Sequence, residues 1–435
     1  MIGIYEFIDD KRWGREHSPS DIEWFIKGVT SGEFPDYQVA AWLMAVCLNG
    51  MTDKETTALT LAMEHSGDVF SPCLDKFCVD KHSTGGVGDK VTLFAAPVCA
   101  SCGVYVPKMS GRGLGFTGGT IDKLEAIPGF RTSLAYDEFI SVIKSAGFAI
   151  TGQTGSLCPA DKKLYALRNA TATVESIPLI CSSIMSKKLA TGADGIVLDV
   201  KVGDGAFMKD EQSAEQLASA MLRTAELAGK KASALLTDMN KPLGRNVGNA
   251  LEVIEAVEAL KGNAEEDFSE VAYAVTAEML SLAGKGSPEE CMAMAHEAVS
   301  SGKALEFFRK MIGLQGGDIR VIEDYSLFAQ PKYKRAVYAD NTGYIGGISC
   351  EKTGLASLKL GAGRKDKSSD IDMSAGIIFT ARVGDRVNKG DELAVLYTST
   401  DCDIDGIARE FADNFTICEN QVKNRKNVIK VLRNC

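Results

Sequence analysis

Apolar residues at helical spacing dominate the first 65 residues, which predict three helices. The first helix follows Ser20 and Glu23, which we interpret as a capping box. Its apolar positions recur every three or four residues: Ile22, Phe25, Ile26 and Val29. A second helix spans residues 35–50, and Thr52 begins a third. The second helix is so apolar that it needs partners, either within this unit or in another subunit.

From Cys78 onward, short apolar segments alternate with helical ones. The strand candidates are Val104–Val106, Ala149–Ile150, Ile196–Val202 and Ala234–Leu236. Ala-rich helices near residues 213–229 and 250–261 separate or follow them. This alternation predicts a mainly parallel α/β sheet. We expect two further helices within residues 161–192 to return to the N-terminal helical unit.

Beyond Tyr333 the segments become short, strand-like and separated by Gly, Asn and Asp. The strand candidates here are Arg335–Ala339, Ile345–Ile348, Ile377–Val383 and Glu392–Tyr397. Val383–Gly390 resembles the hairpin of lipoyl- or biotinyl-type β domains. The fold class is therefore α/β with three predicted domains: a helical domain (1–65 and 161–192), a larger mixed α/β domain (70–160 and 193–330) and a β-rich C-terminal α+β domain (331–435).

Composition narrows the protein class. The chain has 435 residues, of which 45% are hydrophobic and 24% charged, as in ordinary globular proteins. Its 12 cysteines form no Cys/His cluster at zinc spacing, which favours reduced thiols and a cytoplasmic location. We see no signal peptide, and the most apolar stretch, Leu93–Val106, contains Pro97 and is too short to cross a membrane.

The distribution of charge is more informative than its sum. The net charge of −10 argues against a nucleic-acid partner. Residues 81–190, however, hold twelve Lys and Arg against seven Asp and Glu, a balance of +5, which leaves −15 for the remainder. A cationic segment in an acidic protein suits a small anionic ligand, although scattered surface lysines could give the same balance.

A Gly-rich segment at residues 80–90 is the sharpest candidate site, and it precedes a predicted helix at Val91–Ser101. Its glycines allow backbone N–H groups to turn toward an anion, and the helix N-terminus adds partial positive charge. Lys81 supplies a full charge, while Ser83 and Thr92 supply hydroxyl groups. The segment lacks the Gly-Lys-Ser/Thr ending of a P-loop, so it predicts a different oxyanion site or, alternatively, a structural turn.

A second Gly-rich run at residues 108–120 contains G-x-G-x-x-G spacing. A dinucleotide-binding fingerprint opens a full helix, whereas Pro128 cuts the following segment short, so we reject that interpretation. Lys108 with the hydroxyl groups of Ser110 and Thr120 instead predicts a second wall for the same anion.

These motifs resemble those of the thymidine and pyrimidine-nucleoside phosphorylase family. The resemblance continues through Pro159–Lys163, Arg168, Ser182–Lys188 and Asp199–Gly203 and extends over essentially the whole chain. It implies phosphorolysis of uridine, deoxyuridine or thymidine to free base and (deoxy)ribose 1-phosphate. It also implies inorganic phosphate as co-substrate, no organic cofactor, a homodimer formed by the helical domain, and a cleft that closes by a hinge.

The resemblance implies a role for each matching residue. Phosphate would be bound by Lys81, Ser83, Thr92, Lys108, Ser110 and Thr120. The catalytic residues would be His82, near O2 of the pyrimidine, and Arg168, Ser183 and Lys187, near its carbonyl and imide groups. Independently, Ser183 and Lys187 are four residues apart and share one helix face. A buried ammonium needs a partner, which a flat base would provide, unless Lys187 extends to solvent.

Some family members carry a monovalent cation such as K⁺, bound mainly by backbone carbonyls. By position, its ligands here would be Gly88, Lys90, Leu243, Asn246 and Glu255. The chain also departs from the expected pattern at Phe116, where relatives have His, and at Asp204, which is more acidic than expected at the pocket edge.

Three alternative functions remain. Lys108 resembles the broad-specificity enzymes, but a thymidine phosphorylase restricted to deoxynucleosides is the nearest alternative. A related phosphoribosyltransferase would share the fold, although no Asp-Glu pair suited to magnesium is visible. A biotinyl or lipoyl carrier would need a modified lysine, and none of the C-terminal lysines has the expected flanking residues.

Overall fold

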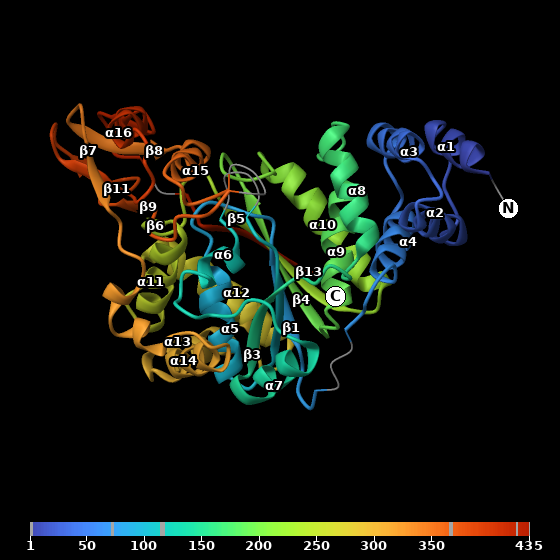
Figure 1. Cartoon of the computed structure of the whole chain (residues 1–435), viewed down its shortest axis with the longest axis horizontal. Coiled ribbons are helices and arrows are strands. Elements are labelled where there is room, and N and C mark those ends of the chain that lie inside the picture. Colours follow the sequence, from blue (N-terminus) through green and yellow to red (C-terminus); the bar gives the residue numbers. More distant parts are fainter. Residues whose placement is uncertain (1–2, 71–73, 114–117, 365–368, 423–424, 435) are drawn as a thin grey trace.

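The computed structural model describes residues 3–70, 74–113, 118–364, 369–422 and 425–434. The chain forms three units, which lie along the longest axis of the molecule (Figure 1). The helical unit and the C-terminal unit lie at opposite ends, and the α/β unit lies between them. In the described part of the chain, no helix combines the length and apolarity that crossing a bilayer requires.

The helical domain combines two separate stretches of sequence. Its helices are α1 (Ile4–Arg12), α2 (Pro19–Ser31), α3 (Asp36–Asn49), α4 (Asp53–Glu64), α8 (Pro159–Ala170) and α9 (Ile177–Ala190). Trp42 of α3 is fully buried among apolar side chains from α1 and α2. Leu164 of α8 and Leu179 of α9 belong to the same core. Helices α8 and α9 thus pack against the N-terminal helices.

Two predictions for this domain were wrong in detail. Helix α1 was not predicted, because its nine residues are rich in charge and one of its buried positions is Lys11, which pairs with Glu55 at 2.5 Å. Helix α2 is capped by Ser18 rather than Ser20, since Pro19 takes the first helical position, where no N–H group is needed. Helix α4 begins after Thr52 as expected, and Thr52 and Glu55 form a capping box there.

The α/β domain is built on a four-stranded sheet in the order β1-β4-β5-β13. Its parallel strands are β1 (Val79–Ser83), β4 (Gly195–Val202) and β5 (Lys231–Asp238), and β13 (Val428–Arg433) is antiparallel. A second parallel pair consists of β2 (Val106–Ser110) and β3 (Phe148–Gly152). The helices of this domain are α5 (Val91–Ser101), α6 (Thr120–Leu124), α7 (Tyr136–Ala146), α10 (Glu211–Leu227), α11 (Asn249–Leu260), α12 (Glu266–Leu282), α13 (Pro288–Ser300) and α14 (Lys303–Leu314), followed by 3₁₀ helices η1 (Ile319–Ile322) and η2 (Tyr325–Leu327).

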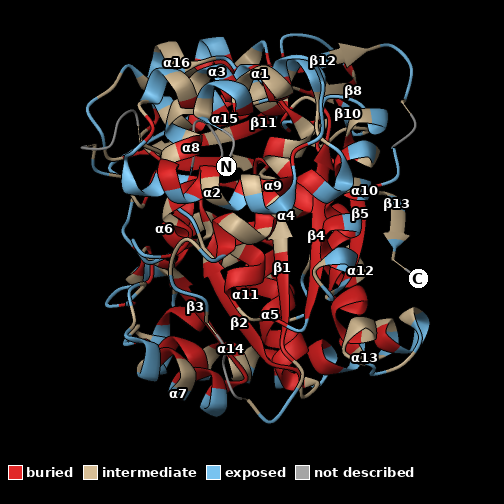
Figure 2. Ribbon diagram, turned by 90° about the vertical axis from the view of Figure 1, so that its right-hand side faces the viewer, coloured by how far each residue is buried: buried red, intermediate tan, exposed pale blue. Residues whose placement is uncertain are grey.

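The parallel strands are mostly buried, and so is α5, which lies within the core of this domain (Figure 2). This continuous apolar burial is typical of parallel sheets with helices on both faces. Helix α5 tolerates Pro97 near its C-terminal end, so the predicted helix at Val91–Ser101 is confirmed.

Strands β1 and β2 join at their beginnings and diverge at their ends. Around the start of β1, the Val79 N–H group donates to the Tyr105 carbonyl at 2.9 Å, and the Tyr105 N–H group donates to the Phe77 carbonyl at 3.0 Å. Beyond this point the two strands belong to separate sheets. Their diverging carboxyl ends open a gap, and ligands of α/β proteins bind at such a place.

The C-terminal domain exchanges strands with the α/β domain. One sheet has the order β6-β9-β11-β7 and the other β10-β8-β12. Their elements are β6 (Asn246–Val247), β7 (Tyr333–Tyr338), β8 (Gly343–Ile348), α15 (Cys350–Lys359), β9 (Gly376–Phe379), β10 (Arg386–Val387), β11 (Glu392–Thr398), α16 (Ile404–Ala412) and β12 (Phe415–Cys418). Strand β6 comes from the α/β part of the sequence, whereas the last strand, β13, joins the α/β sheet.

The predicted hairpin at Val383–Gly390 was only partly right. Strands β9 and β11 are antiparallel neighbours, as in a hairpin. The segment between them contains β10, however, which pairs with β8 in the other sheet. The connection therefore links two sheets instead of forming a free tip.

Candidate active site

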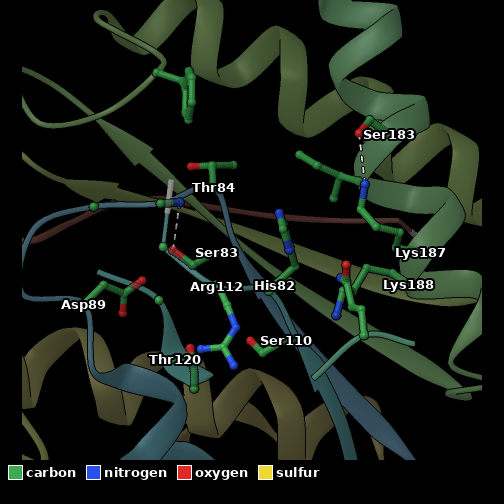
Figure 3. Close-up of a pocket in the computed structure, with 18 of the residues that line it drawn as sticks. His82, Ser83, Thr84, Asp89, Ser110, Arg112, Thr120, Ser183, Lys187 and Lys188 are labelled. Atoms are coloured by element: carbon green, nitrogen blue, oxygen red, sulfur yellow. Dashed lines mark hydrogen bonds between the residues drawn. The ribbon is translucent and has the colours of Figure 1, made fainter. Parts of the chain in front are cut away.

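A cavity of about 450 Å³ lies between the carboxyl ends of β1 and β2 and the helices α8 and α9. It brings together nine of the ten residues to which the sequence assigned catalytic or phosphate-binding roles: His82, Ser83, Thr92, Lys108, Ser110, Thr120, Arg168, Ser183 and Lys187. In Figure 3, Ser83, Ser110 and Thr120 lie on the α/β side, and Ser183 and Lys187 project from a helix on the other side. His82 lies between the two groups.

The first wall of the cavity is the loop between β1 and α5. The Ser83 hydroxyl accepts the Gly85 N–H group at 3.3 Å, which turns the backbone back on itself. Gly85 has φ of 97°, a value that side-chain-bearing residues rarely adopt. A Cβ atom at Gly86 would lie 2.6 Å from the Met239 side chain, so glycine fits best there. Thr92 adds its hydroxyl from the first turn of α5.

The second wall follows β2 and leads into α6. Ser110 ends the strand, and Thr120 begins the short helix. The Asp122 carboxylate accepts the Gly113 N–H group at 2.6 Å and pairs with Arg364 at 2.7 Å. It therefore joins α6 to the segment that follows β2. The departure noted at Phe116 lies outside the described residues.

Asp80 lies beneath both walls, in the gap between the diverging strands. One carboxylate oxygen is 2.7 Å from the Lys188 ammonium, and the other is 3.3 Å from the Lys108 ammonium. Lys108 also donates to the Lys81 carbonyl, and Lys188 donates to the Met109 carbonyl at 3.2 Å. Burial alone raises the pKa of Asp80, but the charges of Lys108 and Lys188 outweigh it and lower that pKa.

Lys81 is the predicted phosphate ligand that the structure places elsewhere. It alternates with Asp80 and His82 along β1, so its side chain leaves on the other face of the strand. Its ammonium is 3.2 Å from Asp199 and 3.6 Å from Asp89, and it is almost fully buried. Lys81 therefore contributes positive potential from beneath the loop and does not line the cavity.

Lys108 is unusual among the cationic residues of the site because its charge is easily lost. Burial lowers the pKa of its ammonium, the attraction of Asp80 opposes this, and repulsion from Lys188 and Lys81 adds to the lowering. The resulting pKa is about 7. At neutral pH, Lys108 is therefore charged only part of the time, and an added anion would favour its charged form.

On the helical side, Arg168 of α8 is buried and bound by backbone carbonyls. Its guanidinium donates to Leu179 at 3.1 Å, to Thr173 at 3.3 Å and to Val174 at 2.5 Å. Burial lowers its pKa, but an arginine remains charged over the physiological range. These contacts fix the plane of the guanidinium at the cavity wall and leave part of its five N–H groups for a ligand.

Lys187 and Ser183 of α9 form the predicted pair. The Lys187 ammonium donates to the Ser183 hydroxyl oxygen at 3.0 Å and forms an ion pair with Asp161 of α8. The expectation that a ligand must supply the partner of Lys187 was therefore wrong, because Asp161 already neutralises it. Asp161 lies in a motif that carried the family resemblance, but the sequence did not indicate which side chain it faces.

His82 is surrounded by positive charge. Burial and the nearby ammonium groups of Lys188 and Lys108 hold the pKa of its imidazole well below its usual value. The imidazole is consequently neutral at pH 7 and has one N–H donor and one acceptor nitrogen.

The remaining cavity wall is apolar. Phe207, which is half exposed, closes one edge, and Ile180 and Ile184 of α9 line another. Asp204 does not alter this edge directly. Its carboxylate accepts the Ser349 hydroxyl and the Glu351 N–H group, each at 3.0 Å, and so ties the Phe207 loop to the C-terminal domain.

Three of the five predicted cation ligands meet beside the first wall. The Leu243 and Asn246 carbonyls and the Glu255 carboxylate converge on one point, as the resemblance implied. The group at that point is the ammonium of Lys90. Gly88 packs against the same loop, where an added Cβ atom would lie 2.6 Å from the Leu243 carbonyl oxygen.

Comparison with known proteins agrees with this geometry. Residues 5–67 match the model described as "Glycosyl transferase family, helical bundle domain", and residues 75–305 match "Glycosyl transferase family, a/b domain". The fold and the site thus define a glycosyl transferase with its cavity between these two domains. Residues 344–418 match "Pyrimidine nucleoside phosphorylase C-terminal domain".

Similar curated proteins are named pyrimidine-nucleoside phosphorylase. Those of Geobacillus stearothermophilus and Bacillus subtilis are each 47% identical to this chain, over 97% and 95% of it, and the alignments cover 97% and 96% of the relatives. The protein of Staphylococcus haemolyticus is 45% identical over 95% of this chain and 96% of its own length. The chain belongs to the pyrimidine-nucleoside phosphorylase family.

A solved structure extends the likeness in fold. Anthranilate phosphoribosyltransferase from Thermus thermophilus superimposes with a TM-score of 0.59, and the match covers 71% of this chain and 98% of the other. At 19% sequence identity this likeness concerns the fold alone.

We predict that Asp80→Asn destabilises the protein by about 3 kcal/mol or more, because the Lys108 and Lys188 ammonium groups would lose their buried counter-charge. Urea unfolding measures this change. The control is Glu23→Gln, which removes an exposed ion pair with Lys27 and is expected to leave the unfolding midpoint unchanged. Equal midpoints for the two variants would refute the central role given to Asp80.

Proposed function

We propose that the protein cleaves pyrimidine nucleosides with inorganic phosphate and releases the free base and (deoxy)ribose 1-phosphate. One observation carries this proposal: a single cavity has an anion-binding wall on one side and cationic donors suited to a pyrimidine on the other. The names of its relatives, which are 45–47% identical along almost their whole length, support the same reaction.

Phosphate binds on the α/β side in this proposal. The Gly-rich loop, the first turn of α5 and the hydroxyl groups of Ser83, Ser110 and Thr120 provide hydrogen-bond donors, and Lys108 provides charge. From this wall a phosphate oxygen approaches C1′ of the pentose on the face opposite the base. The glycosidic electron pair leaves with the base, and the new C1′–O bond completes the transfer.

The helical side stabilises the negative charge that develops on the departing base. Arg168 uses some of its N–H groups for backbone carbonyls, and Lys187 uses two of its donors for Asp161 and Ser183. The donors that remain can bind the carbonyl and imide groups of a pyrimidine. Because they are held in place before the reaction, little reorganisation is needed as charge develops.

His82 acts as a hydrogen-bond donor in this scheme. Its lowered pKa means that it does not store a proton at pH 7, so a neutral N–H group faces O2 of the pyrimidine. A histidine near O2 could donate a hydrogen bond or transfer a proton, and the lowered pKa of His82 favours the first role. The growing negative charge on the base strengthens that hydrogen bond along the reaction coordinate.

We further propose that both ribo- and deoxyribonucleosides are substrates, because Lys108 resembles the broad-specificity enzymes of the family. No organic cofactor enters this reaction, since phosphate and the nucleoside together supply every atom transferred. A strict preference for thymidine over uridine would point instead to the restricted thymidine phosphorylase.

The cavity requires closure, and the structure offers a hinge. The three connections between the helical and α/β domains run beside one another. The Asp68 N–H group donates to the Ser156 carbonyl at 3.0 Å, and the Phe70 N–H group donates to the Ala190 carbonyl at 2.8 Å. Because the connections are joined at one place, the helical domain can rotate as a unit and exclude water from the reactants.

We also propose a cytoplasmic homodimer that forms through the helical domain. Large apolar side chains gather on its outer helices: Tyr5, Tyr37 and Leu48 are 72%, 75% and 76% exposed. Tyr37, Met44 and Leu48 occupy one face of α3, which supports the second of the two expected kinds of packing, against another subunit.

The first test is release of uracil from uridine and of thymine from thymidine, each with and without phosphate. We expect release only with phosphate. His82→Ala should lower the rate on the order of 10²-fold, because a hydrogen bond to the developing charge is lost. His65→Ala is the matched control, since His65 is exposed on the surface and should behave as wild type. Phosphate-independent release would overturn the proposed reaction, and a fully active His82→Ala would remove His82 from it.

The second test concerns pH. Since the pKa of Lys108 is about 7, its charge is complete well below that pH and is lost above it. Phosphate is already dianionic above about pH 8, so the KM for phosphate should rise up to about tenfold per further pH unit. In Lys108→Met the KM should be high and nearly independent of pH. A flat profile in the wild-type enzyme would contradict the role assigned to Lys108.

The third test concerns the dimer. Leu48→Glu places a charge in the proposed interface, so we expect monomers in sedimentation equilibrium. The control Leu355→Glu changes a 41% exposed leucine of α15 in the C-terminal domain and should leave the mass unchanged. A wild-type protein that sediments as a monomer would refute the proposal.

A further inference from the structure

Lys90 immediately precedes α5, and its side chain is completely buried. Its ammonium has three N–H groups, and each finds an oxygen acceptor. The Leu243 carbonyl lies at 2.8 Å, the Asn246 carbonyl at 3.0 Å, and the third acceptor is the Glu255 carboxylate of α11. The donors of the ammonium are thereby all used.

The acceptors are held in place by the surrounding backbone. One oxygen of the Glu255 carboxylate accepts the Arg245 N–H group at 2.7 Å, and the other accepts the Asn246 N–H group at 2.9 Å. Gly244 has φ of 75°, and a Cβ atom there would collide with the same carboxylate. The loop is thus built to present oxygen atoms inward around one small cation.

These residues do not fit an additional monovalent metal ion. The carbonyl and carboxylate oxygens that would bind it already surround the Lys90 ammonium. A second cation beside a buried ammonium would face strong repulsion with only one carboxylate to balance both charges. Three of the ligands implied by the family resemblance, Leu243, Asn246 and Glu255, surround the centre, but Lys90, which was expected to be a ligand, fills it with its own side chain.

We propose that the Lys90 ammonium is a built-in replacement for the monovalent cation, so that this enzyme needs no potassium. An ammonium group and K⁺ are similar in size, carry the same charge and bind the same oxygen atoms. The tethered group cannot dissociate, and its occupancy does not depend on the salt around the protein. This inference concerns stability as well as activity and does not rest on the proposed reaction.

The position of Lys90 explains why a cation is needed here at all. The residue follows directly on the Gly-rich loop that forms the first wall of the active site. Its acceptors belong to the loop before β6, to β6 itself and to α11, and β6 extends the sheet of the C-terminal domain. The ammonium therefore joins the anion-binding loop to α11 and, through β6, to the sheet of the C-terminal domain.

The test compares thermal unfolding in KCl, NaCl and choline chloride at equal ionic strength. We expect the wild-type Tm to be the same in all three salts and its phosphorolysis rate to agree within about twofold. Lys90→Ser removes the ammonium and leaves the oxygen cage with room for an ion. Its Tm in choline chloride should fall by at least about 3 °C and recover selectively in KCl, because binding to the folded state stabilises it.

Two further variants separate a cation site from general destabilisation. Lys90→Met fills the space with an apolar chain, so its Tm should fall without recovery in KCl. Lys11→Ser removes the ammonium of another buried pair, with Glu55, where the described residues provide no ring of carbonyls, and should show no K⁺ effect either.

A wild-type Tm or rate that rises selectively with K⁺ would overturn the proposal. So would a Lys90→Ser variant that responds equally to all three salts. If that variant does not fold in any salt, the wild-type comparison alone decides the question.

Discussion

The structure depends on one buried arrangement of charge, the Asp80 carboxylate between the ammonium groups of Lys108 and Lys188. It occupies the place where β1 and β2 separate and joins the two sides of the gap. Lys108 comes from β2 and Lys188 from α9, which means that the carboxylate connects both domains of the active site. Without this counter-charge the two cations beneath the cavity would repel each other in a poorly solvated environment.

The same positive charge determines the chemistry of the neighbouring groups. Together with burial, it keeps His82 neutral, lowers the pKa of Lys108 to about 7, and makes the floor of the cavity attractive to an anion. The helical side adds Arg168 and Lys187, each held by protein acceptors before any substrate arrives. In the proposed reaction, negative charge is thus stabilised on both sides of the reacting carbon C1′: on the incoming phosphate and on the departing base. Lys90 is a further example of an internal cation at the site, because its ammonium helps to fix the Gly-rich loop that forms the first wall.

Most of the architecture could be predicted because it follows local periodicity. Helices α2 to α4 and strands β3 to β5 lie at or near the predicted segments, whereas β1 was not among the predicted strands and β2 begins only at Val106. Helix α1 was missed because its buried face includes Lys11, which looks like a surface residue until Glu55 is placed beside it. The exchange of β6 and β13 between domains was not visible either, since short strands show periodicity but not the sheet they join.

The sequence by itself determined most of the residues that form the two Gly-rich walls of the active site, because each wall is a continuous motif at the end of a strand. It could not determine how the buried charges pair. Asp80 meets Lys188, Asp161 meets Lys187, and Lys90 meets oxygen atoms of Leu243 and Asn246. Lys81, assigned to the phosphate, turns toward Asp199 instead. Such pairs join segments far apart in the chain, and only the packing of strands and helices decides which charge lies within reach of which partner.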